Sequence, residues 1–275
     1  MSRYAVMGNP IHHSKSPAIH RLFAEQCHIA LDYRAIEVAL DEFEQAVRRF
    51  QAEGGAGLNV TVPFKLDAFA LADRRSQRAL VAQAVNTLKF EGDGEILGDN
   101  TDGIGLVRDL TRNLKLKLHG RHLLILGAGG AVRGVVGPLL EQGIAGLVVA
   151  NRTVAKAREL EAALATYGPI SGRGFADLGA ERFDVVINGT AASLTGELPP
   201  LPRKLFRDNA VAYDLMYSDE PTPFMRWAHA HGASRVADGL GMLVEQAGGS
   251  FFLWHGVRPS TKPVIKALRH QAMQD

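Results

Sequence analysis

The stretch His122-Leu123-Leu124-Ile125-Leu126-Gly127-Ala128-Gly129-Gly130-Ala131 decides the fold. Its first half is apolar enough for a buried β-strand, and the glycines that follow allow a sharp turn into a helix. Glycines at such a turn let backbone N–H groups approach a pyrophosphate, and the N-terminus of the helix attracts its negative charge. The stretch therefore predicts a dinucleotide-binding turn, with a plain tight turn as the alternative. Val132 stands where a third glycine or alanine is expected.

The end of the next strand, residues 146–150, indicates which dinucleotide binds. NAD sites place Asp or Glu there to hold the ribose 2′-OH, whereas NADP sites carry Arg nearby. Here Asn151, Arg152 and Thr153 follow the strand, and Lys156 lies one turn into the next helix. No acid would repel a 2′-phosphate, and Arg152 can bind one through two parallel hydrogen bonds. The pattern favours NADP, although Thr153 also fits a helix N-cap and Arg152 a surface charge.

Strand-like and helical patterns alternate along most of the chain, which predicts an α/β fold with two open, mostly parallel sheets. The expected strands cover residues 4–7, 33–38, 58–62, 85–90, 122–126, 146–150, 183–188 and 211–215. The expected helices cover residues 17–27, 41–52, 130–142, 154–166, 241–254 and 263–271. Asp41 fits an N-cap, Pro138 a kink or early end, and Pro263 a first helical position.

Composition narrows the class of partner. The 275 residues carry a net charge of +2 and no basic stripe, which argues against a nucleic-acid partner. No apolar run is long enough to span a membrane, and the N-terminus has no signal-peptide pattern. The single Cys27, interpreted as buried packing, favours a reducing cytoplasm. No His/Cys cluster has metal-ligand spacing, so we expect no metal.

Four polar segments in the first half stand out from the apolar elements around them. They cover residues 14–17, 59–65, 84–87 and 98–103. Three lie at or near a strand end, where an open sheet forms its ligand crevice. They supply hydroxyls, amides, an amine and a carboxylate, which suit a small polyhydroxylated acid. Singly, each residue has an ordinary structural explanation; together, the four segments favour a substrate site.

The chain resembles the shikimate dehydrogenase family over essentially its full length. The segments that carry the resemblance, in family order, are GNPIHHSKSPAIH, NVTVPFK, AVNTL, GDNTDG, GAGGA, NRT and ADGLGMLVEQA. The resemblance implies NADPH-dependent, reversible reduction of 3-dehydroshikimate to shikimate, in the pathway to chorismate and the aromatic amino acids. It also implies a substrate-binding and catalytic domain at residues 1–102, a Rossmann-type NADP domain at 103–238, and C-terminal helices at 239–275 that return to the first domain. We expect a monomer or a homodimer.

The resemblance also implies a role for individual residues. Lys65 and Asp102 would be the catalytic pair, with Lys65 moving the proton. The substrate carboxylate would bind Ser14, Ser16 and Tyr217, and its hydroxyls Thr61, Asn86 and Gln246. NADP would contact Gly127, Ala128, Gly129, Gly130, Ala131, Asn151, Arg152, Thr153 and Lys156, with Leu215, Gly239 and Met242 near the nicotinamide.

Two departures from the family pattern affect peripheral cofactor contacts. Residues 190–193 read Thr-Ala-Ala-Ser where serines are expected, and Gln77 replaces an acid. Two other functions stay open: a quinate/shikimate dehydrogenase that also uses NAD, and a non-catalytic dinucleotide sensor on the same scaffold.

Overall fold

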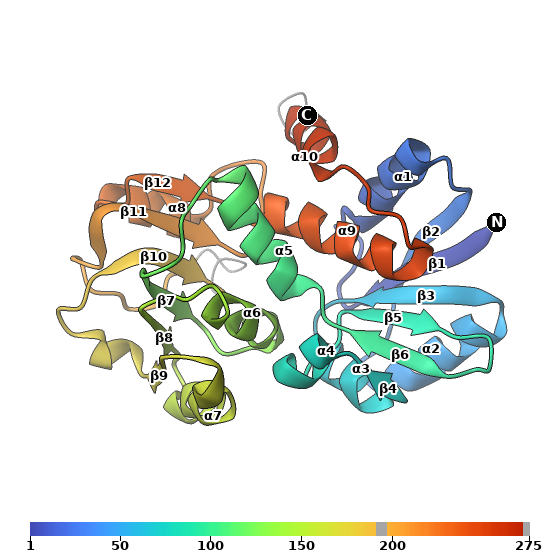
Figure 1. The fold of residues 1–275 in the computed structure, drawn as a ribbon, viewed down its shortest axis with the longest axis horizontal. Coiled ribbons are helices and arrows are strands. Elements are labelled where there is room, and N and C mark those ends of the chain that lie inside the picture. Colours follow the sequence, from blue (N-terminus) through green and yellow to red (C-terminus); the bar gives the residue numbers. More distant parts are fainter. Residues whose placement is uncertain (191–196, 272–275) are drawn as a thin grey trace. The chain divides into compact units, whose positions relative to one another are not determined.

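The computed structural model describes residues 1–190 and 197–271, which form two compact units. Unit 1 comprises residues 1–106 and 243–271, and unit 2 comprises residues 107–242. The chain therefore passes between the units at 106/107 and 242/243, four residues beyond each boundary expected from the sequence. Figure 1 shows one sheet in each unit, flanked by helices. No helix among the described residues is long and apolar enough to cross a membrane.

Unit 1 holds a six-stranded sheet in the order β2-β1-β3-β5-β6-β4. Strands β2, β1 and β3 are parallel, β5 is antiparallel to both β3 and β6, and β4 is parallel to β6. The bounds are β1 Ser2–Gly8, β2 Leu31–Glu37, β3 Gly55–Val60, β4 Arg74–Arg75, β5 Thr87–Phe90 and β6 Ile96–Asp99. The β5–β6 hairpin, which the sequence pattern did not predict, makes this sheet mixed.

Helices cover both faces of the first sheet. One face packs Met7, Leu58 and Val60 against phenylalanines of α2 and the segment before α3. The other face carries α1 and α9, whose Phe23 and Phe251 rings lie 5.7 Å apart. The bounds are α1 Ser16–Cys27, α2 Phe43–Ala52, α3 Lys65–Leu71, α4 Gln77–Ala82, α5 Asp102–Arg108, α9 Leu240–His255 and α10 Thr261–Gln271. Because the α5 and α9 ranges cross 106/107 and 242/243, each of these helices belongs partly to each unit.

Unit 2 is an all-parallel, six-stranded sheet in the order β12-β11-β10-β7-β8-β9. This is the doubly wound, Rossmann-type order, and β7 beside β10 is its topological switch point. The two mostly parallel sheets predicted from the sequence are thus confirmed. The bounds are β7 His122–Leu126, β8 Gly146–Ala150, β9 Ile170–Arg173, β10 Phe183–Asn188, β11 Phe206–Asp214 and β12 Arg235–Ala237.

The two faces of the second sheet have separate cores. Leu124, Val148 and Val186 pack with Phe224 of α8 on one face. On the other, α7 approaches β9 so closely that a Cβ on Gly172 would lie 2.4 Å from the Ala157 carbonyl. The remaining bounds are the π-helical turn η1 Asp109–Asn113, α6 Gly130–Leu140, α7 Val154–Leu164, the 3-10 turns η2 Ala165–Tyr167 and η3 Phe175–Leu178, and α8 Pro223–Ala230.

Several local expectations were wrong. The N-cap of α2 is Glu42 rather than Asp41, and its side chain makes no capping hydrogen bond. Pro263 is the third residue of α10, still inside the first turn, where its missing N–H has no intrahelical acceptor. Cys27 is half-buried at the end of α1 instead of buried. By contrast, the early end expected at Pro138 is confirmed, because the helix that contains it ends two residues after it, at Leu140.

Candidate active site

Lys65 and Asp102 form a largely buried ion pair in unit 1. Lys65 is the first residue of α3, which begins after the turn that follows β3, and Asp102 is the first residue of α5, after β6. Lysine Nζ donates to Oδ2 of Asp102 at 2.5 Å, and the two side chains are 13% and 6% exposed. A buried ammonium held by a carboxylate can deliver a proton to a bound oxygen and take it back.

Asn86 connects this pair to the Thr101 hydroxyl and to α9. Its Nδ2 group lies 2.8 Å from Oδ1 of Asp102, 2.9 Å from the Thr101 hydroxyl and 3.1 Å from Oε1 of Gln246 on α9. Its Oδ1 accepts from the Thr101 backbone N–H at 2.9 Å. The structure therefore brings together Lys65, Asp102, Asn86 and Gln246, four residues that the sequence placed in separate segments.

The antiparallel direction of β5 explains how Asn86 reaches this place. Asn86 precedes β5, so it lies at the edge where β3 and β6 end. The sequence analysis expected the polar segments at or near strand ends, with the carboxyl ends of parallel strands lining the crevice. Asn86 lies at the edge of the sheet that was expected, but it precedes its strand instead of following it.

Asp99 supports the segment that carries Asp102. Its carboxylate, 1% exposed, accepts from the Ser76 hydroxyl at 2.5 Å and from the Asn100 N–H at 2.8 Å, and it forms an ion pair with Arg78. Asn100 in turn accepts from the Asp102 N–H at 3.1 Å. These bonds fix the backbone from which Asp102 projects.

The three other predicted substrate residues of this unit lie on two segments. Ser14 precedes α1, and its hydroxyl accepts from the backbone N–H of Ser16, the first residue of that helix, at 3.3 Å. Thr61 follows β3, and its N–H donates to Met7 at 2.9 Å. Ser16 is buried, and the other two are half-buried. Tyr217, by contrast, lies in unit 2, three residues beyond β11.

A second buried polar cluster joins residues of three predicted polar segments to Ser250, which the sequence analysis missed. Asn59 Nδ2 donates to the Ser250 hydroxyl at 2.9 Å, and that hydroxyl lies 2.7 Å from the hydroxyl of Thr87. Ser250 also lies 3.3 Å from the Thr101 hydroxyl, so this cluster joins the Asn86 network. The signal was present: Ser250 stands four residues after Gln246, on the same face of a mostly apolar helix.

An unusual histidine lies behind that cluster. His20 on α1 is 0% exposed and has no hydrogen-bond partner among the described residues. Its ring stacks on Tyr33, with centroids 4.3 Å apart, and Tyr33 donates to Asn59 at 2.8 Å. Burial lowers the pKa of His20 to about 3 and raises that of Tyr33 well above its usual value, so both are neutral at physiological pH.

In unit 2 the turn after β7 has the features that a pyrophosphate requires. Gly127 adopts φ +102°, and a Cβ there would meet the Gly189 carbonyl at 2.8 Å, so only glycine fits. Gly129 is the N-cap of α6, and a Cβ on it would have no atom within 4 Å. Open space therefore lies beside the first N–H groups of an eleven-residue helix, which fits a phosphate group.

Gly189 explains why Val132 is tolerated in the fingerprint. Val132 is fully buried on α6, and a Cβ on Gly189 would lie 2.5 Å from its Cγ2 atom. A small residue at position 132 would leave room on the helix for the backbone after β10. Val132 fills that room, and Gly189, which has no side chain, lets the helix and the backbone pack closely. The imperfect fingerprint is thus compatible with close packing at the switch point.

In the segment after β8, the side chains of Arg152, Thr153 and Lys156 are available to bind a ligand. Asn151 Nδ2 donates to the Thr153 carbonyl at 2.9 Å and so closes the turn. Thr153 is the N-cap of α7, but its side chain makes no capping hydrogen bond. Arg152 and Lys156 are exposed, and neither forms an ion pair among the described residues. Arg152, Lys156 and the Thr153 hydroxyl have no Asp or Glu beside them in this segment. They therefore suit the ribose 2′-phosphate of NADP better than the ribose 2′-OH of NAD.

Leu215, Gly239 and Met242 also lie in unit 2. The Gly239 N–H donates to Met216 at 2.9 Å, and a Cβ on Gly239 would lie 2.2 Å from the Leu215 carbonyl oxygen. Glycine is therefore needed at 239 because the two backbones touch. Met242, in the first turn of α9, is 7% exposed.

Models of three domain families match the chain. The shikimate dehydrogenase substrate binding domain matches residues 6–88, the shikimate / quinate 5-dehydrogenase domain residues 109–195, and the shikimate 5′-dehydrogenase C-terminal domain residues 239–269. A protein named shikimate dehydrogenase (NADP(+)) from Alkalilimnicola ehrlichii is 59% identical over 97% of this chain and 98% of its own length. The chain belongs to the shikimate dehydrogenase family.

Solved structures of similar sequence share the fold. Shikimate 5-dehydrogenase from Thermus thermophilus, in complex with NADP(H) and shikimate, is 32% identical and superposes with a TM-score of 0.86, covering 99% of this chain and 100% of that one. An Ael1 enzyme from Pseudomonas putida is 52% identical, with a TM-score of 0.90 and 98% of both chains covered.

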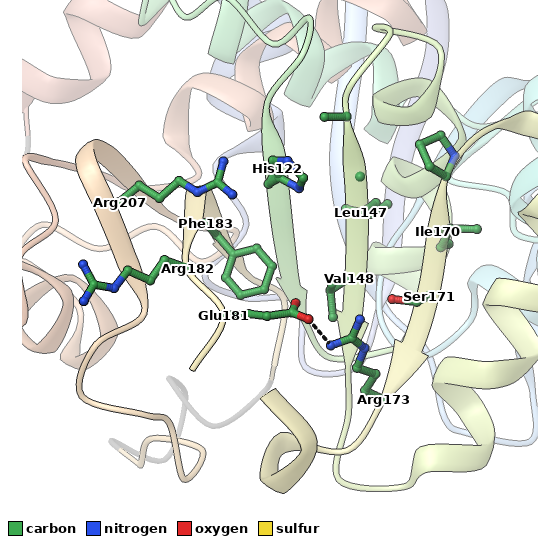
Figure 2. Close-up of a pocket in the computed structure, with 13 residues that line it drawn as sticks. His122, Leu147, Val148, Ile170, Ser171, Arg173, Glu181, Arg182, Phe183 and Arg207 are labelled. Atoms are coloured by element: carbon green, nitrogen blue, oxygen red, sulfur yellow. Dashed lines mark hydrogen bonds and ion pairs between the residues drawn. The ribbon is translucent and has the colours of Figure 1, made fainter. Parts of the chain in front are cut away.

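Two features stand apart from the predicted site of this family member. Of the departure at residues 190–193, Thr190 donates from its hydroxyl to Oδ1 of Asn188 at 2.7 Å, and residues 191–193 lie outside the described residues. A groove on the second sheet has a volume of about 520 Å³ and is lined by no predicted site residue. Figure 2 shows the side chains that line it, among them Val148 and Phe183. Two of its arginines already have carboxylate partners, Arg173 with Glu181 at 2.7 Å and Arg207 with Asp184 at 3.0 Å. The pKa of the Asp184 carboxyl is below its usual range. Partial burial alone would raise this pKa, but hydrogen bonds from the backbone N–H of His122 and from Arg121, together with the charge of Arg207, lower it by more.

Proposed function

We propose that this protein catalyses the reversible, NADPH-dependent reduction of 3-dehydroshikimate to shikimate. The observation that carries the proposal is the buried Lys65–Asp102 pair, held by Asn86 in unit 1 of a chain that belongs to the shikimate dehydrogenase family. The place of the reaction would be the pathway to chorismate and the aromatic amino acids. A cytoplasmic location and a monomeric or homodimeric state stay predictions.

In this reaction NADPH supplies the hydride, and the protein must position the reactants and move one proton. Lys65 donates a proton from Nζ to the oxygen of the 3-carbonyl as that oxygen becomes a hydroxyl. In the reverse direction Nζ takes the proton back. Asp102 orients Nζ through Oδ2, while Oδ1 is engaged by Asn86, so the carboxylate cannot rotate freely away from Lys65.

The other residues bind the reactants. Thr61, Asn86 and Gln246 would contact the hydroxyls of the substrate, and Ser14, Ser16 and Tyr217 its carboxylate. The support is their match to the family segments; for Asn86 and Gln246 it is also their position beside Asp102. Lys65 and Asp102 argue against the alternative of a non-catalytic sensor, which needs no such pair.

Unit 2 would hold NADP. Gly127, Ala128, Gly129, Gly130 and Ala131 would contact the pyrophosphate, where the open space beside Gly129 supports binding. Asn151, Arg152, Thr153 and Lys156 would contact the 2′-phosphate, and Leu215, Gly239 and Met242 would lie near the nicotinamide.

The alternative substrate is quinate, because one matching family is described as shikimate / quinate 5-dehydrogenase. The test is an absorbance assay of NADPH formation from NADP⁺ with shikimate, run in parallel with quinate. We expect turnover with shikimate at a much higher kcat/KM than with quinate. Equal values would favour the dual-substrate alternative, and no turnover with either would refute the proposal.

A further inference from the structure

Tyr213 and Asp109 form a buried hydrogen-bonded pair in unit 2 that the proposed chemistry does not use. Tyr213 is the last but one residue of β11, and Asp109 is the first residue of the π-helical turn that continues α5. The Tyr213 hydroxyl donates to Oδ2 of Asp109 at 2.7 Å, and the two residues are 0% and 4% exposed. Burying a carboxylate destabilises a fold unless hydrogen-bond or charge partners compensate it. This buried pair therefore calls for a functional explanation.

The geometry around Asp109 allows little freedom. Its Oδ1 accepts from Asn113 Nδ2 at 2.9 Å, so both carboxylate oxygens are engaged. A Cβ on Gly241 would lie 2.0 Å from Oδ1, so the first turn of α9 touches the carboxylate itself. π-Helical turns in α-helices frequently occur at functional sites. The turn here places Asp109 directly against the backbone of α9.

The same hydroxyl also holds α9. The Met242 backbone N–H, one of the first-turn donors that lack an intrahelical acceptor, donates to the Tyr213 oxygen at 3.3 Å. Burial, reinforced by the negative charge of Asp109, raises the pKa of Tyr213 well above its usual value. The hydroxyl therefore keeps its proton: it donates to Asp109 and accepts from Met242 at the same time.

Three restraints thus meet on residues 239–242. The Gly239 N–H donates to Met216, Gly241 touches Asp109, and Met242 donates to Tyr213. We propose that Tyr213 and Asp109 are positioning residues, which fix the backbone of residues 239–242 for the nicotinamide end of the cofactor. This inference rests on the proposed function, in which Gly239 and Met242 lie near the nicotinamide. It adds two residues that would act through that backbone without touching the cofactor.

The test is Tyr213→Phe, which removes one oxygen and leaves the ring. A hydride donor that is less well aligned lowers kcat, whereas most cofactor affinity comes from the phosphates bound elsewhere in unit 2. We expect kcat to fall about tenfold, with KM for NADP⁺ and for shikimate each changing less than about twofold. The deuterium isotope effect on kcat, measured with shikimate deuterated at the carbon that gives up the hydride, should rise because hydride transfer becomes more rate-limiting.

Asp109→Asn is the second variant, since the amide places an N–H₂ donor against either Tyr213 or Asn113, which are donors themselves. It should show the same pattern as Tyr213→Phe. The matched control is Asp184→Asn, which removes another carboxylate of unit 2. This carboxylate lies near the start of β10 and pairs with Arg121 and Arg207. That control should lose stability but keep native kcat and the native isotope effect.

Each variant is compared at a temperature at which it is fully folded, as judged by thermal unfolding. Native kcat and isotope effect in folded Tyr213→Phe would overturn the inference and leave the proposed function intact. Failure of both variants to fold at any temperature would also overturn it, because the pair would then support the whole unit and not one segment. Absence of turnover in the native enzyme would instead refute the proposed function.

Discussion

Asp102 has two carboxylate oxygens, and each has its own partner. Oδ2 accepts from Lys65 and Oδ1 from Asn86, while Asn100 accepts from the backbone N–H of Asp102 itself. Because the neighbours of this ion pair are already fixed by hydrogen bonds, they need little rearrangement when a proton moves from Lys65. At the residue scale, the site is therefore an ammonium held in one orientation by a buried network.

Replacing Lys65 should remove the proton carrier and leave the binding groups in place. We expect Lys65→Ala to lower kcat by about 10²- to 10⁴-fold, with a much smaller change in the KM for shikimate. Steady-state kinetics of shikimate oxidation measure both. The control is Lys89→Ala, which removes another partly exposed, ion-paired lysine of unit 1 and should keep native kcat. A near-native kcat in Lys65→Ala would show that another group moves the proton.

At the element scale, sequence periodicity predicted the parallel strands best. The ranges 122–126, 146–150 and 183–188 match β7, β8 and β10 residue for residue, because buried parallel strands are continuous apolar runs bounded by turns. Short or partly exposed elements such as β4, β9 and β12 carry too few apolar residues to show a period. The reversal of β5 could not be predicted either, because the pattern of a strand does not encode the direction of its neighbours.

The same limit applies to the candidate site. Segments rich in polar residues pointed to Lys65, Asn86 and Asp102, since polar residues at strand ends are conspicuous. Ser250 was missed because it is a single polar residue inside an otherwise apolar helix, and its partner Asn59, although it lies in a predicted segment, is distant in sequence. Local patterns reveal strand-end residues but not pairings between α9 and β3.

The turn between β7 and α6 gives a prediction that separates folding from binding. Gly129→Ala should leave the free energy of unfolding almost unchanged, because a Cβ there meets no atom within 4 Å and φ is −81°. The methyl group would occupy the space beside the helix N-terminus, so the affinity for NADP should fall about tenfold or more, as for one lost charge-assisted hydrogen bond. Gly92→Ala, also in open space but in the β5–β6 hairpin, is the control and should change neither quantity. Isothermal titration with NADP⁺ and thermal unfolding decide; unchanged affinity would place the phosphates elsewhere.

At the scale of the whole molecule, the buried His20 makes stability depend on pH. The unfolded chain binds a proton at His20 near pH 6.5, whereas in the folded chain burial lowers the pKa to about 3. Protons therefore favour the unfolded state below about pH 6.5, and the stability present above that pH is lost as the pH falls toward 3. The free energy of unfolding should fall by about 2 kcal/mol between pH 7 and pH 5 from this group alone.

Urea unfolding at a series of pH values measures this loss. His20→Phe, which keeps a ring against Tyr33, should remove most of it, and the half-buried His255, whose pKa burial also lowers, should account for a smaller part. His12→Ala, at an exposed position, is the control and should keep the native pH profile. An unaltered acid sensitivity in His20→Phe would show that other groups cause it.

This shikimate dehydrogenase family member works with NADP, and we assign the preference for NADP over NAD to the segment after β8. Arg152 and Lys156 are exposed there without an acidic partner among the described residues. The decisive measurement is kcat/KM for NADP⁺ and for NAD⁺ at saturating shikimate, in the native enzyme and in Arg152→Ala. We expect native enzyme to favour NADP⁺ strongly, and Arg152→Ala to lose about 10- to 150-fold with NADP⁺ while NAD⁺ is nearly unaffected. Equal losses with both cofactors would show that Arg152 does not recognise the 2′-phosphate, and a native enzyme that favours NAD⁺ would refute the preference for NADP.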